Sequence, residues 1–119
     1  MNISIYTAMQ RIALKMKLLP GFKEEYKKRH DEIWPELKEL LLSKGIDDYS
    51  IFLDEETNIL FAVLKVADES QLGTLPDYAI MQKWWVYMKD IMESNPDHSP
   101  VSIPLKQMFY LSKAPEPVI

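Results

Sequence analysis

Between residues 11 and 18 apolar and polar side chains alternate, and this period of two is typical of a half-buried β-strand. A proline–glycine pair then ends the strand. From residue 22 to residue 33 the apolar positions recur every three or four residues, which predicts a helix. Pro35 cannot extend that helix, but it can begin a second one, for which Gly45 provides a C-terminal stop.

A hairpin, a helix and a last strand follow along the rest of the chain. Apolar stretches at residues 49–54 and 59–66, joined by a polar turn, predict a β-hairpin. Asp77 is placed to cap a further helix. The apolar stripe of that helix is formed by Ile80, Trp84, Tyr87, Met88 and Ile91. A loop with three prolines at residues 95–104 separates this helix from a last strand, which we expect at residues 105–111.

The predicted order β-α-β-β-α-β is that of the ferredoxin-like fold, an α+β arrangement in which helices cover one face of an antiparallel sheet. Residues 59–66 are apolar on both faces apart from Lys65, which indicates a central strand or a face covered by another chain. If the helices cover one face of this strand, Ile59, Phe61 and Val63 lie on the other and are exposed in a monomer. We therefore expect a homodimer in which two sheets pack face to face.

The composition limits the kinds of protein to consider. A chain of 119 residues fits a single domain, which we expect at residues 11–111, between an N-terminal extension (1–10) and a C-terminal tail (112–119). The absence of cysteine excludes disulfides and thiolate sites, and it fits a reducing compartment. No apolar run is long enough to span a membrane and no signal-peptide pattern is present, so we expect a cytoplasmic protein.

The distribution of charge argues against nucleic acid as a partner. The net charge is −4, and no basic stripe runs along the chain. The one cationic run, at residues 27–29, is flanked by Glu24, Glu25, Asp31 and Glu32. We interpret this run as a solvated helix face.

His30 is the first candidate for chemistry. The chain has two histidines, and a histidine exchanges protons near neutral pH because its pKa is about 6.5. His30 comes four residues after Tyr26, so both side chains project from one side of the predicted helix and can hold one small ligand. The alternative is that His30 is an ordinary structural histidine. His98 lies in the predicted loop and is a weaker candidate.

Aromatic residues provide the second set of candidates. Trp84 and Trp85 are adjacent in the predicted helix and point about 100° apart, so one can fill the core while the other lines a cleft. Aromatic faces suit the C–H faces of sugars, although both indoles can equally serve as packing residues. Tyr49, at the start of its strand, either faces a cleft or covers the sheet edge.

Motifs for other chemistries are missing from the sequence. We find no metal-ligand spacing, no glycine-rich phosphate loop, no serine-hydrolase elbow and no convincing pair of glycosidase acids. We therefore expect no metal site.

Residues 26–37, which read YKKRHDEIWPEL, resemble the first-helix motif of the L-rhamnose mutarotase family. Three further blocks agree with that family in order and spacing, namely residues 48–54, the paired-tryptophan segment 83–88 and the loop 95–101. The resemblance implies a dimeric α+β barrel that interconverts the α and β anomers of L-rhamnose without a cofactor. It also implies that His30 is the proton donor and that the sugar is bound by Tyr26, Tyr49, Trp84 and Trp85.

Several alternatives remain open at this point. A non-catalytic ligand-binding protein, or a haem-handling or monooxygenase-like protein, can use the same dimeric fold. L-fucose or a related pyranose can replace L-rhamnose as the sugar. The base that opposes His30 is not identified by the sequence, and neither is the role of the two terminal extensions. His98 stands where the family usually has asparagine, so sugar preference can differ if that loop contacts the ligand.

Overall fold

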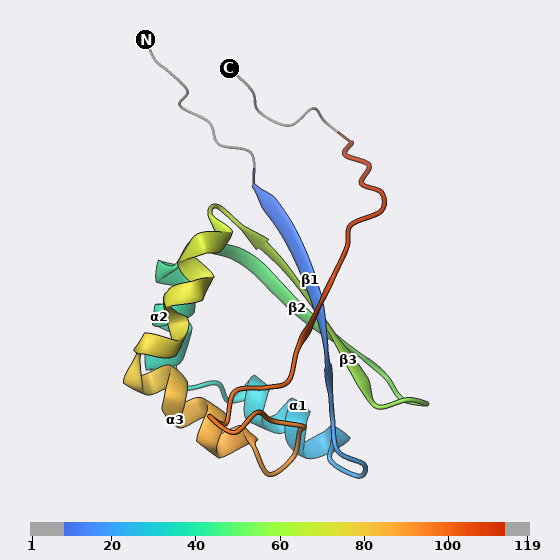
Figure 1. Ribbon diagram of the computed structural model, residues 1–119, viewed down its shortest axis with the longest axis vertical. Helices are drawn as coiled ribbons and strands as arrows, with labels where there is room; N and C mark the ends of the chain where they lie inside the picture. The colour runs from blue at the N-terminus through green and yellow to red at the C-terminus, as the bar shows by residue number, and fades with distance from the viewer. Residues whose placement is uncertain (1–8, 114–119) are drawn as a thin grey trace.

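Four antiparallel strands form one sheet in the order β2-β3-β1-β4, with helices gathered on one side of it (Figure 1). This is a computed structural model, and it describes residues 9–113. The elements are β1 (Gln10–Lys17), α1 (Lys23–Asp31), α2 (Pro35–Ser43), β2 (Ile46–Asp54), β3 (Ile59–Val66), the 3₁₀ helix η1 (Glu69–Asp77), α3 (Ala79–Met88) and β4 (Ile103–Leu105). The ferredoxin-like α+β prediction is confirmed by this order and topology.

The two central strands follow the predicted pattern closely. β1 and β3 pair antiparallel over eight residues each, from Gln10 opposite Val66 to Lys17 opposite Ile59. Along β3 the residues Leu60, Ala62, Leu64 and Val66 are buried, and they alternate with more exposed positions. The buried set faces the helices and forms the core with residues such as Leu18, Leu37 and Ile91.

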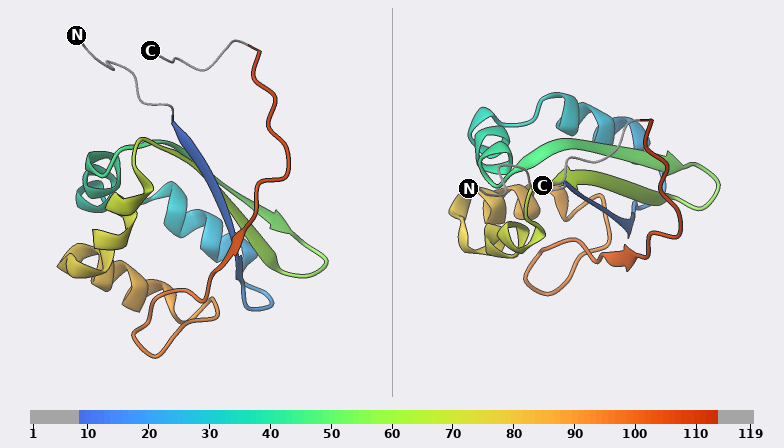
Figure 2. Two further views of the ribbon diagram at one scale, coloured as in Figure 1. Left: turned by 45° about the horizontal axis from the view of Figure 1, so that its top comes forward. Right: turned by 90° about the horizontal axis from the view of Figure 1, so that it is seen from above.

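The outer face of the sheet carries the residues expected there. Val63 is 41% exposed, Ile59 and Phe61 are partly exposed, and Phe52 lies opposite Phe61 and is 57% exposed. No helix covers this face within residues 9–113 (Figure 2). The same part of the chain contains no helix that is long and apolar enough to cross a membrane.

Pro35 separates α1 from α2. Trp34 is extended, with ψ 131°, as expected for a residue that precedes proline, and Pro35 then begins α2. α2 ends before Gly45, whose φ of +87° is the left-handed conformation that favours glycine. Both the helix start at Pro35 and the stop at Gly45 are therefore confirmed.

The prediction of a last strand at residues 105–111 is wrong. β4 covers only Ile103–Leu105, and the following segment leaves the sheet edge, with Met108, Phe109 and Leu111 about four-fifths exposed (Figure 1). The polar pair at residues 106–107 and the apolar run after it do not alternate, so no register on the edge of β1 buries one consistent face.

The helix that precedes this strand also differs from the prediction. Asp77 does not cap α3, because η1 includes that residue and Tyr78 occupies the N-cap without a side-chain hydrogen bond. Within the helix Met81 is buried, whereas Tyr87, which we expected on the apolar stripe, is 41% exposed. The terminal extensions expected at residues 1–10 and 112–119 lie mostly outside the described residues, although Gln10 already belongs to β1.

Candidate active site

All five side chains that the sequence singled out line one cavity of about 830 Å³. They come from three elements, Tyr26 and His30 from α1, Tyr49 from β2, and Trp84 and Trp85 from α3. The remaining lining is mainly apolar, and its charged side chains are Lys23, Lys27, Asp31, Lys38, Asp48 and Glu55. His98 is not among the lining residues.

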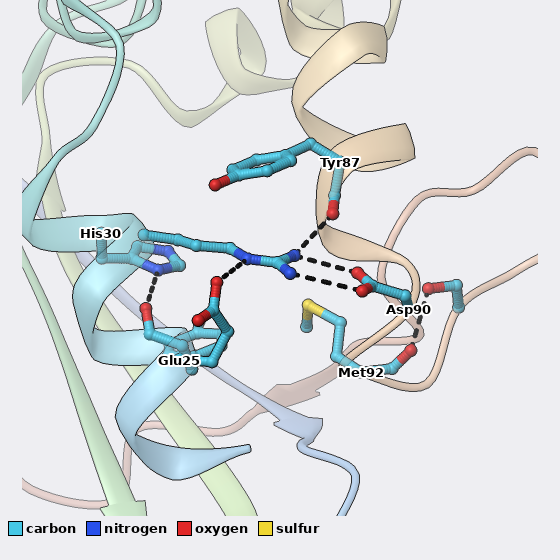
Figure 3. Close-up of polar contacts among 8 residues, drawn as sticks. Glu25, His30, Tyr87, Asp90 and Met92 are labelled. Atoms are coloured by element: carbon cyan, nitrogen blue, oxygen red, sulfur yellow. Dashed lines mark hydrogen bonds and ion pairs between the residues drawn. The ribbon is translucent and has the colours of Figure 1, made fainter.

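His30 is held among aromatic rings at the wall of this cavity. Its imidazole stacks on the Tyr26 ring at 4.2 Å between centroids and meets the Trp84 ring edge-on at 5.4 Å. Its Nδ1 lies 3.1 Å from the backbone carbonyl oxygen of Tyr26 (Figure 3). Because a carbonyl oxygen only accepts hydrogen bonds, Nδ1 carries a hydrogen and donates it. Nε2 is then the nitrogen left to exchange a proton with a ligand.

Burial lowers the pKa of His30 below its usual value of 6.5. The hydrogen bond to the Tyr26 carbonyl and the negative charge of Asp31 act in the opposite direction, but burial is the larger effect. The imidazole is therefore neutral at pH 7, with an unprotonated Nε2.

The two tyrosines keep their hydroxyl protons at neutral pH. Burial raises the pKa of Tyr26, and the nearby Tyr49 raises it further. Burial also raises the pKa of Tyr49, although 43% of the surface of that residue as a whole is exposed. Tyr26 on α1 and Tyr49 on β2 line the same cavity, as a site for one small ligand requires.

The two indoles divide as the sequence suggested. Trp84 is buried, only 6% exposed, and belongs to the core cluster. Trp85 is half-buried and packs against that cluster. Both side chains also contribute to the cavity wall.

Two aromatic residues behind the wall were not predicted as part of the site. The Trp34 ring meets Trp84 edge-on at 5.0 Å and stacks on Tyr87 at 5.4 Å. Tyr87 also contacts Trp84 at 5.6 Å. The available signal was the spacing of three residues between Trp84 and Tyr87, which places both on one side of α3.

The interpretation of residues 27–29 as a solvated face is wrong for Arg29. Its side chain is only 10% exposed, and it forms ion pairs with Glu25 and Asp90. Lys27 and Lys28 are exposed, as expected. The sequence could not reveal the difference, because Asp90 lies 61 residues away from Arg29.

The loop that carries His98 is a local turn. His98 has a φ of +75°, and its backbone N–H donates to the carbonyl oxygen of Asn95 at 2.8 Å. Histidine and asparagine are both enriched in this left-handed conformation. The departure from the family's usual asparagine is thus compatible with the backbone here. Within residues 9–113 no group of three His, Asp or Glu side chains is arranged to hold a metal.

A protein-family model described as L-rhamnose mutarotase matches residues 11–111. A relative named L-rhamnose mutarotase from Mesorhizobium japonicum is 56% identical over 103 residues, covering 87% of this chain and 98% of the relative. Another of that name, from Bacteroides thetaiotaomicron, is 57% identical over 103 residues, covering 87% of this chain and 99% of the relative.

Solved structures agree with these sequence matches. The crystal structure of an L-rhamnose mutarotase from Formosa agariphila has a TM-score of 0.80 and 54% identity, covering 87% of this chain and 99% of that one. A putative antibiotic biosynthesis monooxygenase from Nitrosomonas europaea has a TM-score of 0.58 at 8% identity, covering 90% of this chain and 97% of that one, and shares the fold alone. A family model over residues 11–111 and relatives that are more than half identical show that this chain belongs to the L-rhamnose mutarotase family.

Proposed function

We propose that this protein interconverts the α and β anomers of L-rhamnose, with His30 as the group that transfers the proton. The observation that carries the proposal is that the His30 ring lines a cavity in contact with Tyr26 and Trp84, with Tyr49 and Trp85 in the same lining. The choice of L-rhamnose is supported by the names of relatives that match most of the chain.

The reaction needs one proton to move between two oxygens of the sugar. Opening the pyranose ring breaks the bond between C1 and the ring oxygen, and the anomeric hydroxyl becomes the aldehyde. The neutral imidazole accepts the anomeric hydroxyl proton at Nε2 and, as an imidazolium, donates it to the ring oxygen. Both oxygens are bonded to C1, so one nitrogen can serve both. Rotation about C1–C2 and reversal of these steps give the other anomer, with His30 unchanged.

The other lining residues bind and orient the sugar in this proposal. Tyr26 and Tyr49, whose pKa values are both raised by burial, offer hydroxyl hydrogens to the ring and its hydroxyl groups. Trp84 and Trp85 form an apolar wall that suits a sugar with a methyl group. The scheme requires no metal, redox cofactor or phosphate.

We further propose that the protein works as a homodimer in the cytoplasm. The partly exposed apolar residues on the outer face of the sheet support the dimer, because such a surface normally marks an interface. The cytoplasmic location is a prediction from the lack of cysteine and of a signal-peptide pattern.

Saturation-transfer NMR of L-rhamnose tests the activity directly. Adding the protein should increase exchange between the α and β anomeric signals, and a panel with L-fucose and related pyranoses defines the preferred sugar. A protein that only binds sugar broadens these signals without increasing exchange. A haem-handling protein produces a Soret band with added haem and leaves the rhamnose exchange rate unchanged. Either of those two results contradicts the proposal.

A further inference from the structure

Arg29 makes more contacts than a charged residue on a helix surface usually does. Its Nε donates to Oε2 of Glu25 at 2.7 Å. Its Nη1 donates to Oδ1 of Asp90 at 2.9 Å and to the backbone carbonyl oxygen of Tyr87 at 2.6 Å, and its Nη2 lies 3.3 Å from Oδ2 of Asp90 (Figure 3). The guanidinium also lies over the Tyr87 ring, 4.4 Å from its centroid.

These contacts join two helices that carry different parts of the site. Arg29 precedes His30 on α1, whereas Asp90 follows α3, the helix that carries Trp84 and Trp85. Within residues 9–113, Arg29 makes all the hydrogen bonds and ion pairs that connect α1 with α3 or Asp90. The interaction with Arg29 also lowers the pKa of Asp90, so this carboxylate stays charged.

A series of aromatic contacts connects Arg29 with the His30 imidazole. Arg29 lies over Tyr87, Tyr87 contacts Trp84, and Trp84 meets the His30 imidazole edge-on. A planar guanidinium in a bidentate pair defines orientation as well as distance, which lysine cannot do. The arrangement therefore determines how closely α3 covers the imidazole on α1.

We propose that Arg29 is a positioning residue, which clamps α1 to the end of α3 through Asp90 and Tyr87 and thereby holds His30 against Trp84. Arg29 does not touch the sugar in this proposal, which rests on the function proposed above for His30. Loss of the clamp separates the two helices and admits water to the imidazole. The anomer exchange rate at saturating sugar then falls, because His30 is no longer aligned with the sugar.

The pKa of His30, measured in the sugar-free protein, indicates whether the Arg29 clamp is intact. Tyr26 stacks on the imidazole, and Tyr87 on α3 contacts Trp84 next to it. The other titratable groups in the same cavity lining are Lys23, Lys27 and Asp31 on α1, Lys38 on α2, Asp48 and Tyr49 on β2, and Glu55. Among these residues Arg29 contacts Tyr87, and none of them is replaced in the variants below. Opening the site weakens the desolvation of His30, so its pKa should rise toward 6.5.

The variant Asp90→Ala distinguishes loss of the clamp from loss of a charge, because the two change the pKa of His30 in opposite directions. Removal of a negative charge alone lowers the pKa of a neighbouring histidine, whereas loss of the clamp raises it. Arg29→Met removes a positive charge and the clamp together, so both effects raise the pKa. Arg29→Lys keeps the charge without the bidentate fork, and it should give an intermediate rise. Lys28→Met is the matched control, because Lys28 is the adjacent exposed residue and does not line the cavity.

The experiment is NMR titration of the His30 ring in the sugar-free protein, combined with anomer-exchange kinetics of the same variants. We expect a raised His30 pKa in Arg29→Met and Asp90→Ala, and a saturated exchange rate about 10- to 100-fold lower, with a smaller change in KM. Lys28→Met should match the wild type. An unchanged or lowered pKa in folded Asp90→Ala overturns the proposal, and so do wild-type exchange rates in both clamp variants. If the wild type shows no exchange activity but the His30 pKa still rises in Asp90→Ala, the clamp stands and the proposed function fails.

Discussion

The hydrogen bond from Nδ1 of His30 to the Tyr26 carbonyl selects the nitrogen that can exchange a proton with a ligand. The pair is local, since both residues lie on α1 at a spacing of four. That Tyr26 and His30 share one side of the helix could be predicted from the sequence, because helical spacing determines which side chains share a face. The contact between His30 and Trp84 could not, because it depends on how two distant helices pack.

Acid should reduce activity through His30. The proposed scheme starts from the neutral imidazole, and burial holds the pKa of His30 below 6.5. The exchange rate should therefore be constant around pH 7 and fall only as the pH drops through that lowered pKa. A pH–rate profile at saturating L-rhamnose measures this. A rate that rises toward acidic pH shows that the protonated form is the active one and contradicts the scheme.

The lowered pKa of His30 also predicts a pH-dependent stability. As the pH falls below about 6.5, the unfolded chain binds a proton at this position before the folded protein does, so the free energy of unfolding falls. The loss continues until the pH reaches the folded-state pKa. Urea unfolding of the wild type, of His30→Gln and of His98→Gln between pH 7.5 and pH 5 tests this. His30→Gln should lose less stability than the other two proteins, and equal losses in all three would refute the prediction.

At the level of elements, the turns and the central strand followed most directly from the sequence. The limits of β3 and the helix start at Pro35 agree with the prediction, because alternation and proline chemistry are local properties. β4 is shorter than predicted, because an edge segment without alternation has no preferred register. The prediction that the Arg29 side chain is solvated was wrong because its partner Asp90 is distant in the sequence.

Gly45 provides a test of the junction between α2 and β2. Its φ is +87°, and a Cβ at this position would lie 3.4 Å from the Cβ of Ala67. Gly45→Ala should therefore lower the free energy of unfolding by about 1–2 kcal/mol. Gly73→Ala is the matched control, because a Cβ there meets nothing within 4 Å. Urea unfolding of both variants measures the difference, and equal stabilities would show that the left-handed conformation carries no cost.

For the molecule as a whole, the outer face of the sheet is the surface that remains without a cover in the described residues. Phe52 and Phe61 form a cross-strand pair there, and Val63 lies further along β3. Lys15 pairs with Phe61, and Lys65 follows Val63 by two residues on β3, so both lysines lie on this face as well. An apolar band beside charged residues is the pattern expected for an interface between two copies of the chain.

Val63→Glu should convert the proposed homodimer into a monomer, because it places a charge in the middle of the packed sheets. Val86→Glu is the control, since Val86 is 48% exposed on α3, away from the outer face. Sedimentation velocity distinguishes the two states. A monomeric wild type, or a Val63→Glu variant that remains dimeric, would rule out this interface.

If the His30 imidazole transfers the proton, its loss must slow anomer exchange, and saturation-transfer NMR of His30→Gln measures that rate. A folded His30→Gln protein should exchange L-rhamnose anomers about 10²- to 10⁴-fold more slowly than the wild type at pH 7.5, whereas His98→Gln should retain the wild-type rate. Exchange at the wild-type rate in folded His30→Gln would exclude His30 as the group that transfers the proton.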